Sequence, residues 1–192
     1  MKWLVDPDSP FYNLINFFAD MIILSLLCFL FSLPLITIGA AHTATYYIAK
    51  NRIADKKANI KDFFMAFIKN FIPATLIWIC ILIIASTIFI FYLNFCEIYF
   101  LSPIIFFVCL ELIFFCIYIF PVIATKKENK IINLVKLSFF LAHKYIFTTF
   151  LCLLLAIILF ITCLFYPPLF LISNGLYNCF VCKKISKILA QI

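Results

Sequence analysis

The sequence predicts an all-α protein, a polytopic membrane helix bundle of about five transmembrane helices with amphipathic helices at the cytosolic interface. The first observation is composition: 67% of the 192 residues are hydrophobic and only 12% are charged, whereas soluble domains carry about a quarter charged residues. The second is that apolar runs of membrane-spanning length recur along the chain. The third is that nearly all Lys and Arg lie between these runs. We therefore expect one integral membrane domain over residues 1–192.

Five apolar segments approach the length of about 20 residues that a helix needs to cross a bilayer. Pro34 lies near the end of the first segment and predicts a kink or break around Leu33–Thr37, because proline removes a backbone donor. Tyr166-Pro167-Pro168 predicts a tight turn before the fifth segment, which is short and contains polar residues. The expected spans are residues 14–38, 74–93, 99–123, 146–165 and 169–182.

Residues 33–50 join the first span to the most basic part of the chain, and we expect them to form the first cytosolic corner. Small residues recur there at a spacing of four, which lets helix backbones approach closely. His42 stands alone in this stretch, which favours a polar interfacial residue over a metal ligand. The expected corner and helix-packing residues are Pro34, Gly39, Ala40 and Ala44.

Two segments between the spans are amphipathic. Ile60–Phe71 gathers phenylalanines on one side and charged residues on the other, a pattern typical of a helix that lies in the membrane interface. Asn129–Tyr145 has a similar pattern. The alternative interpretation is that both segments are cytosolic extensions of the spans that follow them. The candidates for docking a partner are Asp62, Phe63, Phe64 and Phe67.

Except for Lys2, every Lys and Arg lies between the first two spans, between the third and fourth, or after the fifth. Positively charged loops stay in the cytosol, so five spans put the N-terminus outside and the C-terminus in the cytosol. If residues 169–182 only re-entered the membrane, the C-terminal lysines would lie outside, which is why we count this segment as a span. The basic residues punctuate apolar runs and form no stripe, so the expected partner is the lipid bilayer and no nucleic acid.

Asp20 and Glu111 are acidic residues within apolar spans, where ionisable groups are costly and are candidates for function. Asp20 shares a helix face with Asn16. We expect no Lys or Arg at the depth of either acid, and we expect Glu111 near the midplane. Both acids have two interpretations, a contact to a substrate or ion and a polar clasp between helices. Glu111 is expected to be protonated or bonded to a hydroxyl or amide such as Ser86, Thr87 or Asn174.

No constellation typical of an enzyme is visible. The nine Cys lie mostly in apolar runs, and Cys179-x-x-Cys182 has no second pair beside it. His42 and His143 are the two histidines, and they do not obviously converge with Glu111. We therefore expect no catalytic residue, no metal site and no cofactor.

Two stretches carry a resemblance to a known family. The first contains Asp8-Ser9-Pro10, Ala19-Asp20 and residues 33–40 with Ala44 and Tyr46, and the second contains Asp62-Phe63-Phe64 and Lys69-Asn70-Phe71. Together they resemble the YesL-like family of bacterial integral membrane proteins, a family defined as a domain of unknown function. The resemblance covers the first 75 residues or so well and the rest only in its pattern of spans.

The resemblance implies a protein of the bacterial cell membrane. Because the family is often found beside carbohydrate uptake systems of the ATP-binding cassette type, it also implies an accessory role in transport. It implies no catalytic or binding residues. The expected function is an accessory subunit associated with a solute (carbohydrate) uptake system, with other membrane transport subunits as partners. The alternative is a stand-alone or oligomeric small-solute transporter or channel.

Overall fold

The computed structural model describes residues 10–53, 60–95, 101–125 and 130–189, and every regular element within them is helical. Four helices contain stretches long and apolar enough to cross a membrane: Ile15–Ser32, Ile60–Asn94, Ser102–Thr125 and Ile146–Phe165. The predicted all-α class with membrane character is confirmed, with four candidate spans in place of five. In chain order the elements are α1 (Pro10–Ser32), η2 (Leu35–Thr37), α2 (Ile38–Ile53), α3 (Ile60–Phe95), α4 (Ser102–Thr125), α5 (Ile131–Lys144), α6 (Ile146–Phe165), η3 (Pro167–Leu169) and α7 (Phe170–Leu189).

Residues 169–182, expected to form a fifth span, are not among the candidate spans found in the described residues. The helix at this place, α7, continues to Leu189 and carries three lysines in its second half. It is not among the helices apolar enough to cross a membrane. Instead, α7 packs along α1 and α2 and buries Val181, Cys182 and Ile185. The predicted turn at Tyr166-Pro167-Pro168 is present, because η3 joins α6 to α7 there.

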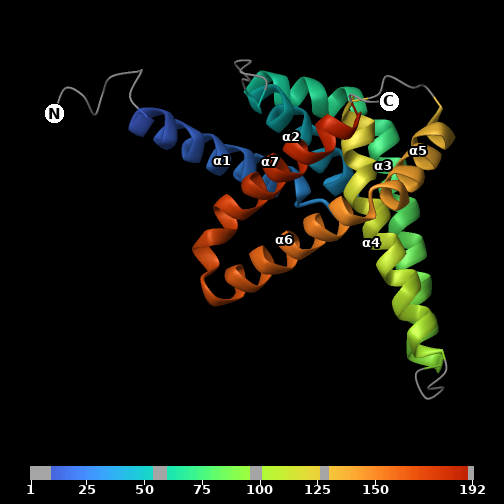
Figure 1. Ribbon diagram of the computed structural model, residues 1–192. Helices are drawn as coiled ribbons and strands as arrows, with labels where there is room; N and C mark the ends of the chain where they lie inside the picture. The colour runs from blue at the N-terminus through green and yellow to red at the C-terminus, as the bar shows by residue number, and fades with distance from the viewer. Residues whose placement is uncertain (1–9, 54–59, 96–100, 126–129, 190–192) are drawn as a thin grey trace.

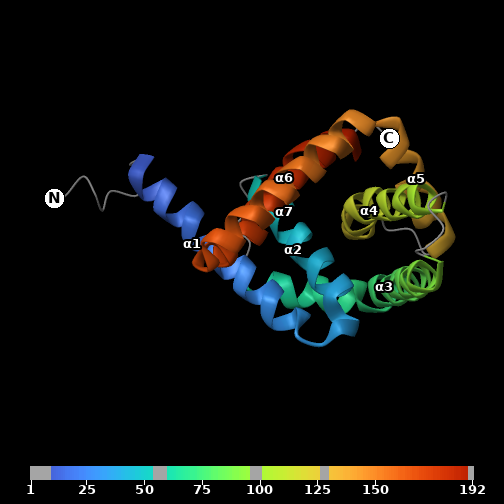
Figure 2. The same ribbon diagram turned by 90° about the horizontal axis from the view of Figure 1, so that it is seen from below.

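Helix α2 occupies the centre of the molecule. It contacts α1, α3, α4 and α7, and Figure 2 shows it within the ring that these helices form. Its buried residues are mostly small, and Ala40, Ala41 and Ala44 are fully buried. The sequence analysis did not predict this helix as a separate element, because it placed residues 33–50 in a corner outside the bundle.

The break predicted around Leu33–Thr37 is present, since α1 ends at Ser32 and the short η2 precedes α2. The Thr37 hydroxyl donates to the Phe31 carbonyl oxygen at 2.6 Å, and Trp78 Nε1 donates to the Leu35 carbonyl oxygen at 2.7 Å. These bonds satisfy backbone groups that a proline break exposes, which apolar surroundings require.

After the break, α2 runs back antiparallel to α1. Asp20 contacts Arg52, and one turn further along both helices Leu24 and Ile48 lie in one buried cluster. The corner is therefore separated from the basic end of α2 by the length of that helix, about 22 Å from Thr37 to Arg52. The expected cytosolic corner at residues 33–50 is corrected to a helical hairpin in which only the far end of α2 is basic.

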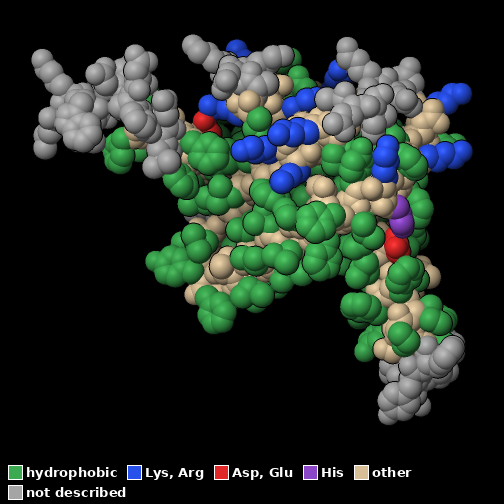
Figure 3. Space-filling model, viewed as in Figure 1, with side chains coloured by type: hydrophobic (Ala, Val, Ile, Leu, Met, Phe, Trp, Pro, Cys, Tyr) green, Lys and Arg blue, Asp and Glu red, His purple; other side chains and the backbone are tan. Residues whose placement is uncertain are grey.

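Helix α3 is one continuous element of 36 residues with Pro73 inside it. Its first part runs along the end of the molecule where Lys and Arg side chains gather, here called the Lys-rich end, and its second part turns away beside α4 (Figures 1 and 3). Proline removes one backbone hydrogen bond and clashes with the preceding turn, which is a common cause of a sharp kink. The amphipathic segment Ile60–Phe71 is thus an extension of the following span, as the second interpretation of this segment holds.

Helix α5 is a separate element that runs antiparallel along α4. Its buried residues Leu134, Ser138 and Leu141 follow helical spacing. The helical backbone conformation is interrupted at Tyr145, and α6 begins at the next residue. At this break the Thr149 hydroxyl lies 3.0 Å from the Ala142 carbonyl oxygen and 3.2 Å from the Tyr118 hydroxyl of α4. These contacts tie the start of α6 to α4 and α5.

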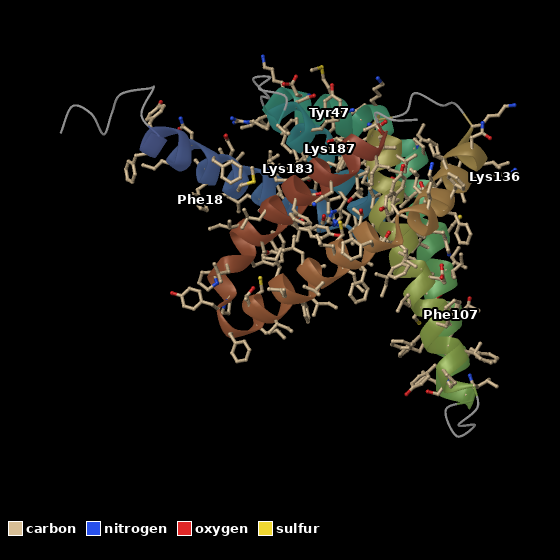
Figure 4. The ribbon with its side chains drawn as sticks, viewed as in Figure 1. Phe18, Tyr47, Phe107, Lys136, Lys183 and Lys187 are labelled. Carbon is tan, nitrogen blue, oxygen red and sulfur yellow. The ribbon has the colours of Figure 1, made fainter. Side chains whose placement is uncertain are left out.

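The helices do not all extend equally far along the direction of α3 and α4. These two helices extend further from the Lys-rich end than the others do, and their far halves form a separate hairpin (Figure 1). In Figure 3, Lys and Arg gather at one end and hydrophobic side chains cover the far hairpin. Figure 4 places Phe107 on that hairpin, whereas Tyr47, Lys136 and Lys187 lie toward the opposite end. Exposed aromatic residues of the far hairpin include Phe89, Phe106 and Phe107.

The two glycines of the chain both lie where helices come very close together. A Cβ at Gly39 would lie 2.7 Å from the backbone oxygen of Ala74 in α3, and one at Gly175 would lie 2.6 Å from the backbone oxygen of Met21 in α1. The Gly175 amide also donates a 2.8 Å hydrogen bond to Ser25 Oγ. Any larger residue at either position has to push two backbones apart.

We predict that Gly39→Ala and Gly175→Ala each lower the stability of the folded protein by roughly 1–2 kcal/mol. The upper value combines two opposing effects. Overpacking against the backbone costs up to about 3 kcal/mol, and the higher helix propensity of Ala returns about 1 kcal/mol. The measurement is the apparent Tm in mild detergent. Ala85→Ser, which adds one heavy atom at an exposed position of α3, is the control. Unchanged Tm values in both glycine variants would contradict the close approach.

Candidate functional site

Asp20 of α1 forms an ion pair with Arg52 at the end of α2. The Asp20 side chain is 17% exposed and that of Arg52 is 38% exposed. The expectation that no Lys or Arg lies at the depth of Asp20 is therefore wrong. Asn16 is exposed one turn earlier on α1. A cavity of about 130 Å³ adjoins the pair and is lined by Asp20, Ile23, Leu24, Leu27, Ile48, Arg52, Ile60 and Phe63.

The antiparallel course of α2 is what brings this pair together. Sequence reasoning missed it because Arg52 was assigned to a cytosolic loop and Asp20 to the outer half of a span. One signal was present, since Arg52 is the only arginine in a chain that otherwise uses lysine. Arginine holds its charge and presents a planar fork that suits carboxylates, which lysine does not.

Glu111 of α4 meets His143 in the last turn of α5, with His143 Nε2 3.1 Å from Glu111 Oε2. The expectation that the histidines and Glu111 do not converge is thus wrong for His143. Ser86 and Thr87, named as expected partners, instead donate to the Ile83 carbonyl oxygen, and Asn174 Oδ1 accepts from Asn178. Glu111 Oε2 has no hydrogen bond from any described residue, so the contact to His143 is electrostatic.

His143 Nδ1 lies 3.0 Å from the Phe139 carbonyl oxygen, which places a proton on Nδ1 because a carbonyl only accepts. Nε2 is therefore the ring nitrogen that faces Glu111. The pair gives Glu111 a polar partner in apolar surroundings, where an ionisable group is costly.

The Asp20–Arg52 and Glu111–His143 pairs lie in different helix pairs, α1 with α2 and α4 with α5. Figure 3 shows acidic side chains at two separate places on the molecule. Asp20 and Glu111 are thus not brought together into one site. Each pair joins neighbouring antiparallel helices, which is the geometry of a clasp.

The expected partner-docking residues are split by the structure. Phe63 is fully buried and Phe67 is partly buried, so a docking role for Phe63 is corrected to a packing role. Both rings contact Phe31 at the end of α1. The ring centroid of Phe31 lies 5.6 Å from that of Phe63 and 5.0 Å from that of Phe67. Phe64 remains exposed. Phe63 and Phe67 thus face inward against the end of α1, whereas Phe64 does not.

A groove of about 1120 Å³ opens at the Lys-rich end, between the end of α2, the first part of α3, the end of α4 and the start of α5. Its polar side chains include Lys50, Lys69 and Asp62. Its apolar side chains include Met65 and Ile72. Sequence analysis named Asp62 but did not predict the groove, because the groove exists only where four helix ends meet.

His42 and the Cys179–Cys182 pair, which also have potentially reactive side chains, take part in packing contacts. His42 stacks on Phe120 with ring centroids 5.9 Å apart, and burial lowers the pKa of its imidazole, so the ring is neutral at pH 7. Cys182 is buried, and Cys179 Sγ lies 3.4 Å from Met21 Sδ. Within the described ranges no group of three or more His, Cys, Asp or Glu has the arrangement of a metal site.

Residues 19–95 match a protein family described as "Protein of unknown function, DUF624". The matched part runs from within α1 to the end of α3 and includes Asp20, Gly39 and Arg52. Comparisons with curated proteins and with solved structures found no match. The comparisons therefore support a family of unknown function for this part of the chain, and the YesL-like resemblance stays a prediction.

We predict that Asp20→Asn and Arg52→Gln each destabilise the α1–α2 hairpin by roughly 1–3 kcal/mol, between the values for exposed and buried ion pairs. The variant with both changes should lose less stability than the two single losses together, because it leaves no unpaired charge. A double-mutant cycle on apparent Tm measures this coupling, with exposed Lys61→Gln as the control for lost charge. Strictly additive losses would rule out the clasp.

A second prediction concerns α5. Glu111→Ala and His143→Ala should each speed amide hydrogen exchange in Ile131–Lys144 about fivefold, which corresponds to a lost contact of about 1 kcal/mol. Exchange in α1 and α2 should stay unchanged. Lys136→Ala removes an exposed charge from the same helix and serves as the control. If α5 exchanges at the wild-type rate in both variants, the pair does not hold α5 to α4.

Proposed function

We propose that this chain is a non-enzymatic accessory subunit of a solute uptake system, of the carbohydrate type, in the bacterial cytoplasmic membrane. The YesL-like resemblance supports the association with uptake systems. The geometry supports a subunit that packs beside other membrane proteins. Three features support this second point. They are the centre of the bundle filled by α2, the two paired acids, and the far hairpin of α3 and α4 that no other described helix covers.

The centre of the bundle is filled by α2. Ala40, Ala41 and Ala44 are fully buried, and the buried hydroxyls of Thr43 and Thr45 donate to carbonyl oxygens one turn back in the same helix. The acids Asp20 and Glu111 are engaged in separate clasps. This arrangement favours a scaffold over a transporter that carries its own polar route through one copy of the chain.

The single observation that carries the proposal is the far hairpin of α3 and α4. Its large apolar side chains are exposed on both helices, with Ile90 and Leu93 on α3 and Phe106 and Phe107 on α4. The other described helices end short of it (Figure 1). A two-helix hairpin that stands alone in one half of a bilayer has its surface open to lipid or to a partner, and the proposal assigns a partner transport subunit to it.

The orientation is part of the same proposal. The Lys-rich end is assigned to the cytosol, because basic segments stay on that side. α1 begins and α7 ends toward this end in Figure 1, so both ends of the described chain are assigned to the cytosolic side. This replaces the topology with the N-terminus outside, which depended on counting residues 169–182 as a fifth crossing.

A second candidate function is an oligomeric small-solute transporter or channel. The uneven shape favours it, because the space beside the far hairpin would also accommodate a second copy. Phe89, Phe106 and Phe107 would then lie between copies.

The proposal predicts that purification from the native host in mild detergent recovers other transport subunits with this chain. Phe106→Ala with Phe107→Ala should reduce that recovery, because it trims the far hairpin. Phe147→Ala, at an exposed position of α6, is the matched control and should leave recovery unchanged. A homo-oligomer that takes up solute in liposomes without other subunits would overturn the accessory role and support the second candidate.

A further inference from the structure

We propose that the groove at the Lys-rich end binds an anionic phospholipid, with its phosphate at the lysines and its acyl chains along the apolar wall. The groove lies where the end of α2 meets the first part of α3, the end of α4 and the start of α5. Figure 4 places Tyr47, one of its lining residues, toward the Lys-rich end. Basic pockets between helices at such an end are the kind of site that recognises anionic lipid headgroups.

The polar lining of the groove matches one phosphodiester. Among the described lining residues, Lys50 and Lys69 bring two positive charges and the carboxylate of Asp62 brings one negative charge, so this lining carries one net positive charge. A phosphodiester carries one negative charge. Tyr47 and Asn70 also line the groove and add groups that bond to headgroup oxygens. A zwitterionic headgroup is neutral overall and would leave the net positive charge of this lining uncompensated.

The apolar side of the groove distinguishes a lipid from a soluble anion. Ile72, Pro73, Ile123 and Leu134 form much of its lining. Met65 and Ile72 are also largely exposed, so part of this apolar lining is accessible from outside the protein. The volume, about 1120 Å³, is at the upper end of small-molecule pockets. A free phosphate or sugar phosphate would leave the apolar wall unfilled, whereas an acyl chain covers it favourably.

The test uses the full chain in mild detergent, with native mass spectrometry to count retained lipids. Phosphatidylglycerol is the anionic probe and phosphatidylcholine is the zwitterionic one. The wild-type chain should retain phosphatidylglycerol in preference. Lys50→Gln with Lys69→Gln should weaken this retention about 30-fold, since each Lys near a membrane surface contributes about fivefold. Lys183→Gln with Lys187→Gln removes the same charge from α7, outside the groove, and should leave retention within about twofold of wild type.

Three results would overturn the proposal. They are equal retention of both lipids by the wild-type chain, an equal loss in the α7 control, and displacement of the lipid by millimolar inorganic phosphate or by an added peptide. If the groove variant fails to fold, Lys69→Gln alone tests the site, because Lys69 is an exposed residue. Lys69→Arg should then restore retention. The outcome does not depend on the accessory role, because it needs no partner protein.

Discussion

The packing of α2 among α1, α3, α4 and α7 is the contact on which the rest of the structure depends. Lipid tails are as apolar as leucine, so helices in a membrane associate through close packing and hydrogen bonds more than through the hydrophobic effect. One helix meets four neighbours closely only if its side chains are short. α2 meets this need with Gly39, Ala40 and Ala44, and the threonines among them turn their hydroxyls onto their own helix.

The course of α2 also decides where the charges lie. Because α2 returns along α1, an acid inside an apolar helix meets the one arginine of the chain. The same relation recurs where α5 returns along α4 and brings His143 to Glu111. An ionised group without a partner is costly in hydrocarbon. Antiparallel neighbours therefore allow acids to remain within apolar helices, and each pair fastens the two helices that supply it.

These contacts concentrate the helices near the Lys-rich end and leave α3 and α4 alone at the other (Figure 1). The two ends of the molecule present different surfaces. The far hairpin exposes large apolar side chains on both of its helices. The Lys-rich end presents a groove lined by charged and apolar residues.

The sequence by itself determined the helical class, the membrane character, the break at Pro34 and the turn at Pro167-Pro168, because length, hydropathy and proline act locally. It also indicated that Gly39, Ala40 and Ala44 form a packing face. Tertiary structure alone decided that α2 turns back into the bundle, that α7 packs along α1, and that Phe63 faces inward. It alone paired Asp20 with Arg52 and Glu111 with His143. The physical reason is that a count of charged residues only assigns each segment to a side of the membrane. The depth of a side chain and its neighbours depend on how closely the helix backbones approach.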